Sequence, residues 1–88
     1  KTAIVSLTKS WAIELGKKNI LINSVAPGPV KTDFLKGLTK QKIQNYIDKT
    51  PLGRLALPEE IAQVVTFLAE NDFINGQTIL INGGRLRH

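Results

Sequence analysis

The sequence contains no cysteine and no methionine among its 88 residues. Without cysteine the chain can form neither disulfide bonds nor thiolate metal sites, so we expect a reducing compartment and a cytoplasmic protein. The missing initiator methionine leads us to expect that these residues are a piece of a longer chain. A chain of this length forms at most one small domain, and its hydrophobic core is marginal.

Long apolar runs and basic clusters are also missing. No stretch approaches the ~20 apolar residues of a membrane span, and the first residues lack the layout of a signal peptide. The net charge is +5, but the 12 lysines and arginines are scattered and only 6% of the residues are aromatic. Nucleic-acid-binding surfaces concentrate such residues. We therefore expect neither a membrane nor a nucleic acid as partner, and no histidine–carboxylate cluster has the spacing of a metal site.

The first part of the chain has the spacing of a helix. Apolar residues recur every three or four positions from Ile4 to Leu15. The apolar stripe covers about 200° of the helix wheel, roughly twice what contact with one sheet requires. Helix 2–15 is therefore predicted to pack on a sheet and on a second helix, and to end at Gly16 in a left-handed cap.

Further elements follow in an order typical of α/β proteins. Residues 19–26 are short and rich in branched apolar side chains, as in a parallel strand covered on both faces. Thr39 is a predicted N-cap, and Pro58 fits the first position of another helix. The predicted order is helix, strand, helices, strand, which describes a right-handed crossover between parallel strands: 2–15, 19–26, 39–49, 58–70 and 77–82.

The sequence PGPVKT, residues 27–32, follows the first predicted strand. Ligands of open α/β sheets bind beyond the carboxyl ends of the strands. Gly28 admits close approach to the backbone, and Pro27 stiffens it. The Val30 N–H and C=O could pair with a planar amide, and the Thr32 hydroxyl could donate to a phosphate. A proline-stiffened connection without a ligand explains the same residues equally well.

Four stretches resemble the short-chain dehydrogenase/reductase family. KTAIVSLTKSWAIEL resembles the segment that begins at the lysine of its Tyr-x-x-x-Lys motif. INSVAPGPVKT, PLGRLALPEEIAQVVTFLA and NGQTILINGG resemble three later stretches, in order and at nearly the family's spacing. The resemblance implies that residues 1–88 are the C-terminal segment of one dinucleotide-binding Rossmann domain, part of a doubly wound parallel sheet.

The resemblance also implies roles for individual residues. Lys1 would be the catalytic lysine, which binds the nicotinamide ribose and lowers the pKa of a tyrosine four residues earlier. Without the resemblance, Lys1 would be interpreted as a frayed terminal residue with a solvated ammonium group. Pro27, Gly28, Val30 and Thr32 would bind the cofactor, as would Lys1. Residues 33–55 would form the substrate loop and its helices.

An apolar wall is expected in the substrate loop from Phe34, Leu35 and Leu38, although ordinary packing explains them equally well. The implied function is an NAD- or NADP-dependent oxidoreductase that transfers hydride between nicotinamide and a carbonyl or alcohol. The run is similar to 3-oxoacyl-carrier-protein reductases, so a 3-oxoacyl thioester is an expected substrate. Arg54 is expected to anchor a loop.

The alternative is that the 88 residues act alone. They contain neither the family's catalytic tyrosine and serine nor its glycine-rich turn, so by themselves they should be inactive. They would then serve as a self-associating interaction module with an exposed strand edge. For the intact parent, the resemblance implies a dimer or tetramer formed through helix 2–15 and through helix 58–70 with strand 77–82.

Overall fold

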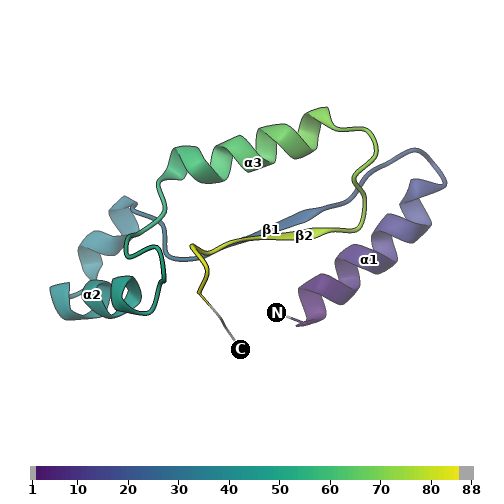
Figure 1. Ribbon diagram of the computed structural model, residues 1–88. Coiled ribbons are helices and arrows are strands. Elements are labelled where there is room, and N and C mark those ends of the chain that lie inside the picture. The colour runs from purple at the N-terminus through teal and green to yellow at the C-terminus, as the bar shows by residue number, and fades with distance from the viewer. Residues whose placement is uncertain (1, 86–88) are drawn as a thin grey trace. The chain divides into compact units, whose positions relative to one another are not determined.

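The computed structural model describes residues 2–85, apart from the side chains of residues 2, 33 and 34. Four helical segments and two strands make up the described chain, with three of the helical segments between the two strands (Figure 1). The predicted order is confirmed, with one short 3-10 helix, η1, that the sequence analysis missed. In chain order the elements are α1 (Thr2–Gly16), β1 (Ser24–Pro27), η1 (Asp33–Gly37), α2 (Lys40–Asp48), α3 (Pro58–Glu70) and β2 (Thr78–Ile81).

The strands β1 and β2 pair in a two-stranded sheet. The Ser24 N–H donates to the Gln77 carbonyl, and the Gly28 N–H donates to the Ile81 carbonyl, both at 2.9 Å. Both strands therefore advance by four residues in the same direction between these bonds, which makes the pairing parallel. The strands are joined by a long helical crossover, so the α/β class is confirmed.

The chain divides into two compact units. The first comprises the residues up to Ala26 together with Val64–Ile79. Its centre is formed by the buried face of α1, where Thr8 and Ala12 are buried. The Thr8 hydroxyl donates to the Ile4 carbonyl at 2.8 Å, which satisfies it within its own helix.

The second unit comprises Pro27–Gln63 and the residues from Leu80 onward. Its buried residues include Leu35 and Thr50. The Thr39 hydroxyl accepts a hydrogen bond from the Lys42 N–H at 3.2 Å, which confirms the predicted N-cap of α2.

The predicted cap of α1 at Gly16 is wrong. Gly16 remains helical, and Asn19 is the residue with positive φ, at 65°. The Asn19 N–H donates to the Gly16 carbonyl, and the Ile20 N–H donates to the Leu15 carbonyl. These two bonds form a Schellman motif in which asparagine takes the left-handed position that glycine usually occupies.

The strand predicted over 19–26 is also too long, since β1 begins only at Ser24. The Ile22 N–H is taken by the side chain of Asn75 rather than by a neighbouring backbone. Ile20 is 46% exposed and Leu21 37%, so the expected cover on both faces is absent from the described residues. Continuous apolar sequence predicted a strand, but pairing partners determine where one starts.

Candidate functional site

The segment from Pro27 to Thr32 leaves the sheet at the carboxyl end of β1. The Gly28 N–H continues the ladder by one residue, through its bond to the Ile81 carbonyl. A Cβ on Gly28 would lie 3.3 Å from the Asn82 Cα. Glycine is thus favoured here by close backbone packing against the end of β2, a reason that the sequence analysis did not foresee.

Val30 forms an isolated parallel bridge with Ala56. The Lys31 N–H donates to the Ala56 carbonyl at 2.8 Å, and the Ala56 N–H donates to the Pro29 carbonyl at 3.1 Å. These bonds use the groups that flank Val30, because backbone groups of an extended chain alternate in direction. The Val30 N–H and C=O therefore point away from Ala56, and neither has a hydrogen-bond partner within residues 2–85.

Thr32 follows in extended conformation, with φ −134° and ψ 172°. Its carbonyl accepts from the Leu35 N–H at 3.0 Å and so starts η1. Its side chain makes no capping hydrogen bond to that helix and is exposed. A hydroxyl that is not committed to the backbone is available to a ligand.

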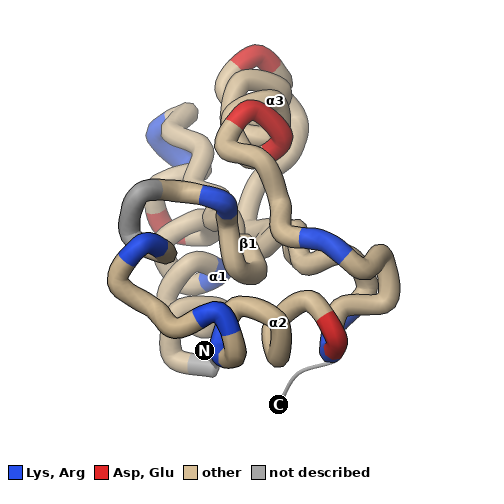
Figure 2. Tube along the Cα trace, turned by 90° about the vertical axis from the view of Figure 1, so that its left-hand side faces the viewer, with Lys and Arg blue, Asp and Glu red and all other residues tan. Residues whose placement is uncertain are grey.

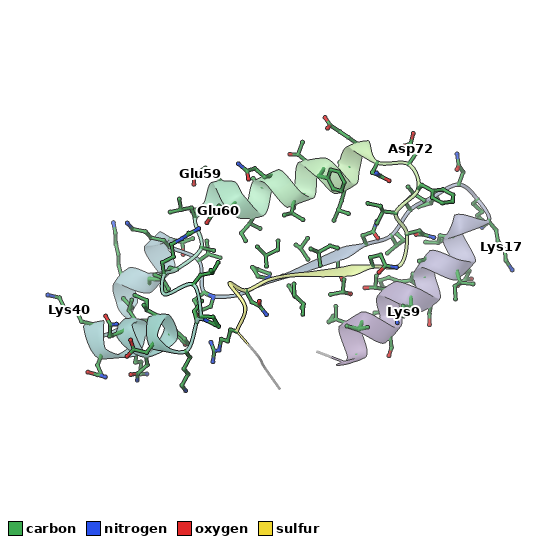
Figure 3. The ribbon with its side chains drawn as sticks, viewed as in Figure 1. Lys9, Lys17, Lys40, Glu59, Glu60 and Asp72 are labelled. Atoms are coloured by element: carbon green, nitrogen blue, oxygen red, sulfur yellow. The ribbon has the colours of Figure 1, made fainter. Side chains whose placement is uncertain are left out.

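The partner segment, residues 54–57, is fixed by an ion pair. Arg54 Nη1 donates to Glu60 Oε1 at 2.8 Å and Arg54 Nη2 to Glu60 Oε2 at 2.7 Å, a bidentate pair. Glu60 Oε1 also accepts from the Leu57 N–H at 2.8 Å at the start of α3, where Figure 3 labels it beside Glu59. Arg54 Nη1 donates to the Leu55 carbonyl at 3.1 Å as well. Arg54 therefore anchors this loop, as expected.

The ion pair shifts the pKa values of both Arg54 and Glu60. The hydrogen bonds from Arg54 and then from the Leu57 N–H stabilise the carboxylate, which lowers the pKa of Glu60 to about 2. The same contact with Glu60 raises the pKa of Arg54. Both groups are therefore charged throughout the neutral range, and the loop that pairs with Val30 keeps its anchor.

A cavity of about 120 Å³ lies in the second unit beside these segments. It is smaller than the roughly 300 Å³ at which ligand pockets usually begin. This cavity by itself is thus too small to be an enclosed ligand pocket. The wall includes Gly28, Pro29, Thr50, Arg54, Ala56 and Asn82.

The predicted site residues fall into three groups. Pro27, Gly28, Val30 and Thr32 lie on one continuous segment, which is the segment just described. Lys1 and the side chain of Phe34 lie outside the part of the chain that the structure describes. The two other residues of the predicted apolar wall differ in burial. Leu35 is 8% exposed and belongs to the interior, whereas Leu38 is half-buried.

Two residues of this arrangement escaped the sequence analysis. Ala56 pairs with Val30 across 25 intervening positions, and nothing local in the sequence marks such a pair. Glu60 had a usable signal, since an acidic residue three positions after Leu57 is typical of a capping box. Residues 2–85 hold no group of three His, Cys, Asp or Glu that could bind a metal ion. In the same range, no helix is long and apolar enough to cross a membrane.

Comparisons with known proteins agree on one family. A family model described as enoyl-(acyl carrier protein) reductase matches residues 1–85. The chain is 42% identical over 86 residues to a 3-oxoacyl-(acyl-carrier-protein) reductase of Thermotoga maritima. It is 47% identical over 88 residues to dehydrogenase/reductase SDR family member 4 of Oryctolagus cuniculus. Each match covers 96% of this chain but only 35% and 34% of the relative, so the chain spans about a third of the curated relatives' length.

Solved structures give the same result. A 3-oxoacyl-(acyl-carrier protein) reductase from Brucella melitensis matches with a TM-score of 0.90 and 35% identity, over 99% of this chain and 33% of that one. A 3-hydroxyacyl-CoA dehydrogenase type-2 from Mycobacterium avium matches with a TM-score of 0.89 and 27% identity, over 99% and 34%. The parallel strands and their helical crossover are thus part of a Rossmann-type sheet, and the chain belongs to the short-chain dehydrogenase/reductase family of oxidoreductases.

Proposed function

We propose that the chain supplies the nicotinamide-binding edge of an NAD- or NADP-dependent oxidoreductase acting on a carbonyl or alcohol. The observation that carries this proposal is the pairing of Val30. Its bridge to Ala56 occupies the neighbouring backbone groups and leaves the Val30 N–H and C=O without partners in the described chain. Partly buried backbone groups usually have hydrogen-bond partners, so the unpaired N–H and C=O of Val30 are suited to bind a ligand.

The free groups fit the cofactor's chemistry. A nicotinamide carboxamide carries one carbonyl acceptor and one amino donor, which complement an N–H and a C=O from the same residue. The Thr32 hydroxyl, two residues further on, can donate to a phosphate oxygen. The bridge to Ala56 and the Arg54–Glu60 pair hold the segment still, so the bound ring would keep one face toward the substrate. When bound, the nicotinamide supplies or accepts the hydride.

Lys1 would complete this edge by binding the cofactor ribose and by lowering the pKa of a tyrosine four residues before it in the parent. This role rests on the family motif alone. The physical basis is that a nearby cation favours the phenolate, so the tyrosine can exchange a proton with the substrate oxygen near neutral pH.

A 3-oxoacyl thioester is the substrate class that we favour. Two of the matched proteins are named for acyl groups modified at the 3-position, one carried by acyl carrier protein and one by coenzyme A. Residues 31–49 contain five lysines and two aspartates, and Figure 2 shows blue stretches in and around α2. A basic surface beside the substrate loop would attract an acidic carrier or a phosphorylated one.

We also propose a cytoplasmic homo-oligomer. Helix α1 carries apolar side chains that are half exposed, among them Ile4 at 56% and Trp11 at 48%. Phe67 of α3 and Leu80 of β2 are likewise exposed, at 58% and 62%. Apolar surfaces of this kind mark protein contacts.

The test measures NADH and NADPH binding by the full-length protein through nicotinamide fluorescence. Thr32→Val keeps the shape of the side chain but removes its hydroxyl. If Thr32 donates to a phosphate, Kd should rise about tenfold or more, since such bonds are worth roughly 1.5–3 kcal/mol. Thr39→Ala is the matched control, because the Thr39 hydroxyl only caps α2.

Equal Kd values for both variants and the unchanged protein would remove Thr32 from the site. A folded protein that binds neither nucleotide would reject the proposed function as a whole. The self-associating interaction module would then be the better description.

A further inference from the structure

The chain contains two asparagine–glycine pairs with matched neighbours. Asn75-Gly76 and Asn82-Gly83 each follow an isoleucine. In such a pair the glycine nitrogen can attack the asparagine side-chain carbonyl, because no Cβ on the following residue hinders the approach. Local sequence gives the two pairs almost the same intrinsic reactivity, so differences between them must come from the fold.

Asn75 is held by contacts with distant segments of the first unit. Its Oδ1 accepts from the Ile22 N–H at 2.9 Å, and its Nδ2 donates to the carbonyl of the buried Ala12 at 2.9 Å. The attacking nitrogen is occupied too, since the Gly76 N–H donates to the Ile22 carbonyl at 2.8 Å. Reaction at Asn75 therefore requires three tertiary hydrogen bonds to break.

Among residues 2–85, the Asn82 side chain is hydrogen-bonded only to its near neighbours. Its Oδ1 accepts from the Gly84 N–H at 3.0 Å, and its Nδ2 donates to the Arg85 carbonyl at 2.9 Å. The Gly83 N–H has no hydrogen-bond partner among residues 2–85. The Gly84 N–H also stands where negative charge develops on Oδ1 during attack, which stabilises the tetrahedral intermediate.

We propose that Asn82 is a site of spontaneous deamidation in the folded protein. The Gly83 nitrogen loses its proton to a solvent base and bonds to the Asn82 Cγ. The Cγ–Nδ2 bond of Asn82 then breaks, and Nδ2 leaves as ammonia after taking a proton from water. One water molecule opens the resulting five-membered imide. Opening at Cγ gives aspartate, and opening at the backbone carbonyl carbon gives isoaspartate with a longer main chain.

The change alters the end of the second unit. A carboxylate cannot donate to the Arg85 carbonyl, so the bond from Nδ2 is lost. Arg85 lies over the ring of Tyr46, with its guanidinium carbon 5.9 Å from the ring centroid. Deamidation should therefore loosen Arg85 and place a negative charge on the cavity wall to which Asn82 belongs.

The experiment incubates the full-length protein at mildly alkaline pH and follows both sites by mass spectrometry. Trypsin leaves Asn75 and Asn82 in one peptide, residues 55–85. Both sites are therefore recovered and ionised equally, and fragmentation of the peptide shows which asparagine has been deamidated. Reaction at Asn75 breaks three hydrogen bonds, whereas reaction at Asn82 breaks only the bond from Nδ2 to the Arg85 carbonyl. The net difference of two ordinary bonds predicts that Asn82 converts roughly thirtyfold faster than Asn75 in the folded protein. In concentrated urea the two rates should become similar.

Two variants complete the test. Asn82→Gln should abolish the change at that position, because ring closure through the longer side chain is much slower. Asn75→Asp leaves the Asn82 environment intact, so its Asn82 rate should be unchanged as long as the protein stays folded. Equal rates at Asn75 and Asn82 in the folded protein would overturn the proposal, and so would a ratio as large in urea as in buffer.

Discussion

Asn75 connects three segments of the first unit through one side chain, and its removal should be among the most damaging changes there. Asn75→Ala deletes the acceptor of the Ile22 N–H and the donor to the Ala12 carbonyl. Each bond contributes about 1 kcal/mol, and each leaves a part-buried partner unsatisfied at a further cost, which gives a total of about 2–4 kcal/mol. In a protein of the matched relatives' length, about three times that of this chain, the unfolding midpoint should fall by roughly 4–16 °C.

The assay is thermal and urea unfolding followed by far-ultraviolet circular dichroism. Asn75→Asp retains an oxygen for the Ile22 N–H but loses the donor to Ala12, so it should lie between the alanine variant and the unchanged protein. Asn45→Ala is the control, because the Asn45 side chain bonds only to Gln41 on the exposed face of α2. If Asn75→Ala and Asn45→Ala destabilise the protein equally, Asn75 does not connect the segments as described.

Two other predictions concern charge and assembly. The depressed pKa of Glu60 means that its pair with Arg54 stabilises the fold fully above its ordinary value of 4.5 and loses that effect as pH falls to about 2. Glu60→Gln should weaken the dependence of the unfolding midpoint on pH across this window. If the variant showed the same pH dependence as the unchanged protein, the described ion-pair geometry would be contradicted. If the protein is the homo-oligomer that we propose, Trp11→Glu should convert it to monomers in sedimentation velocity, whereas the control Lys9→Glu should not; an intact Trp11→Glu oligomer would exclude α1 from the interface.

Local sequence was sufficient where local interactions decide the structure. Thr39 caps α2 and Pro58 opens α3 at the predicted residues, because a hydroxyl acceptor and a fixed φ act within one helical turn. The order of elements and the family resemblance also followed from the sequence. They indicated the turn at residues 27–32 before its geometry was known.

Contacts between distant segments settled what the sequence left open. β1 begins only at Ser24, because the Ile22 N–H is bound by the Asn75 side chain instead of by a strand. Asn19 rather than Gly16 takes the left-handed position after α1, where the Ile20 N–H reaches the Leu15 carbonyl. The pairing of Val30 with Ala56 shows which backbone groups are committed and which are free. The sequence by itself, through the family resemblance, indicated which residues are expected to carry the chemistry. Only the tertiary structure decided which of their hydrogen bonds remain available, because a backbone group's partner lies wherever the chain has folded.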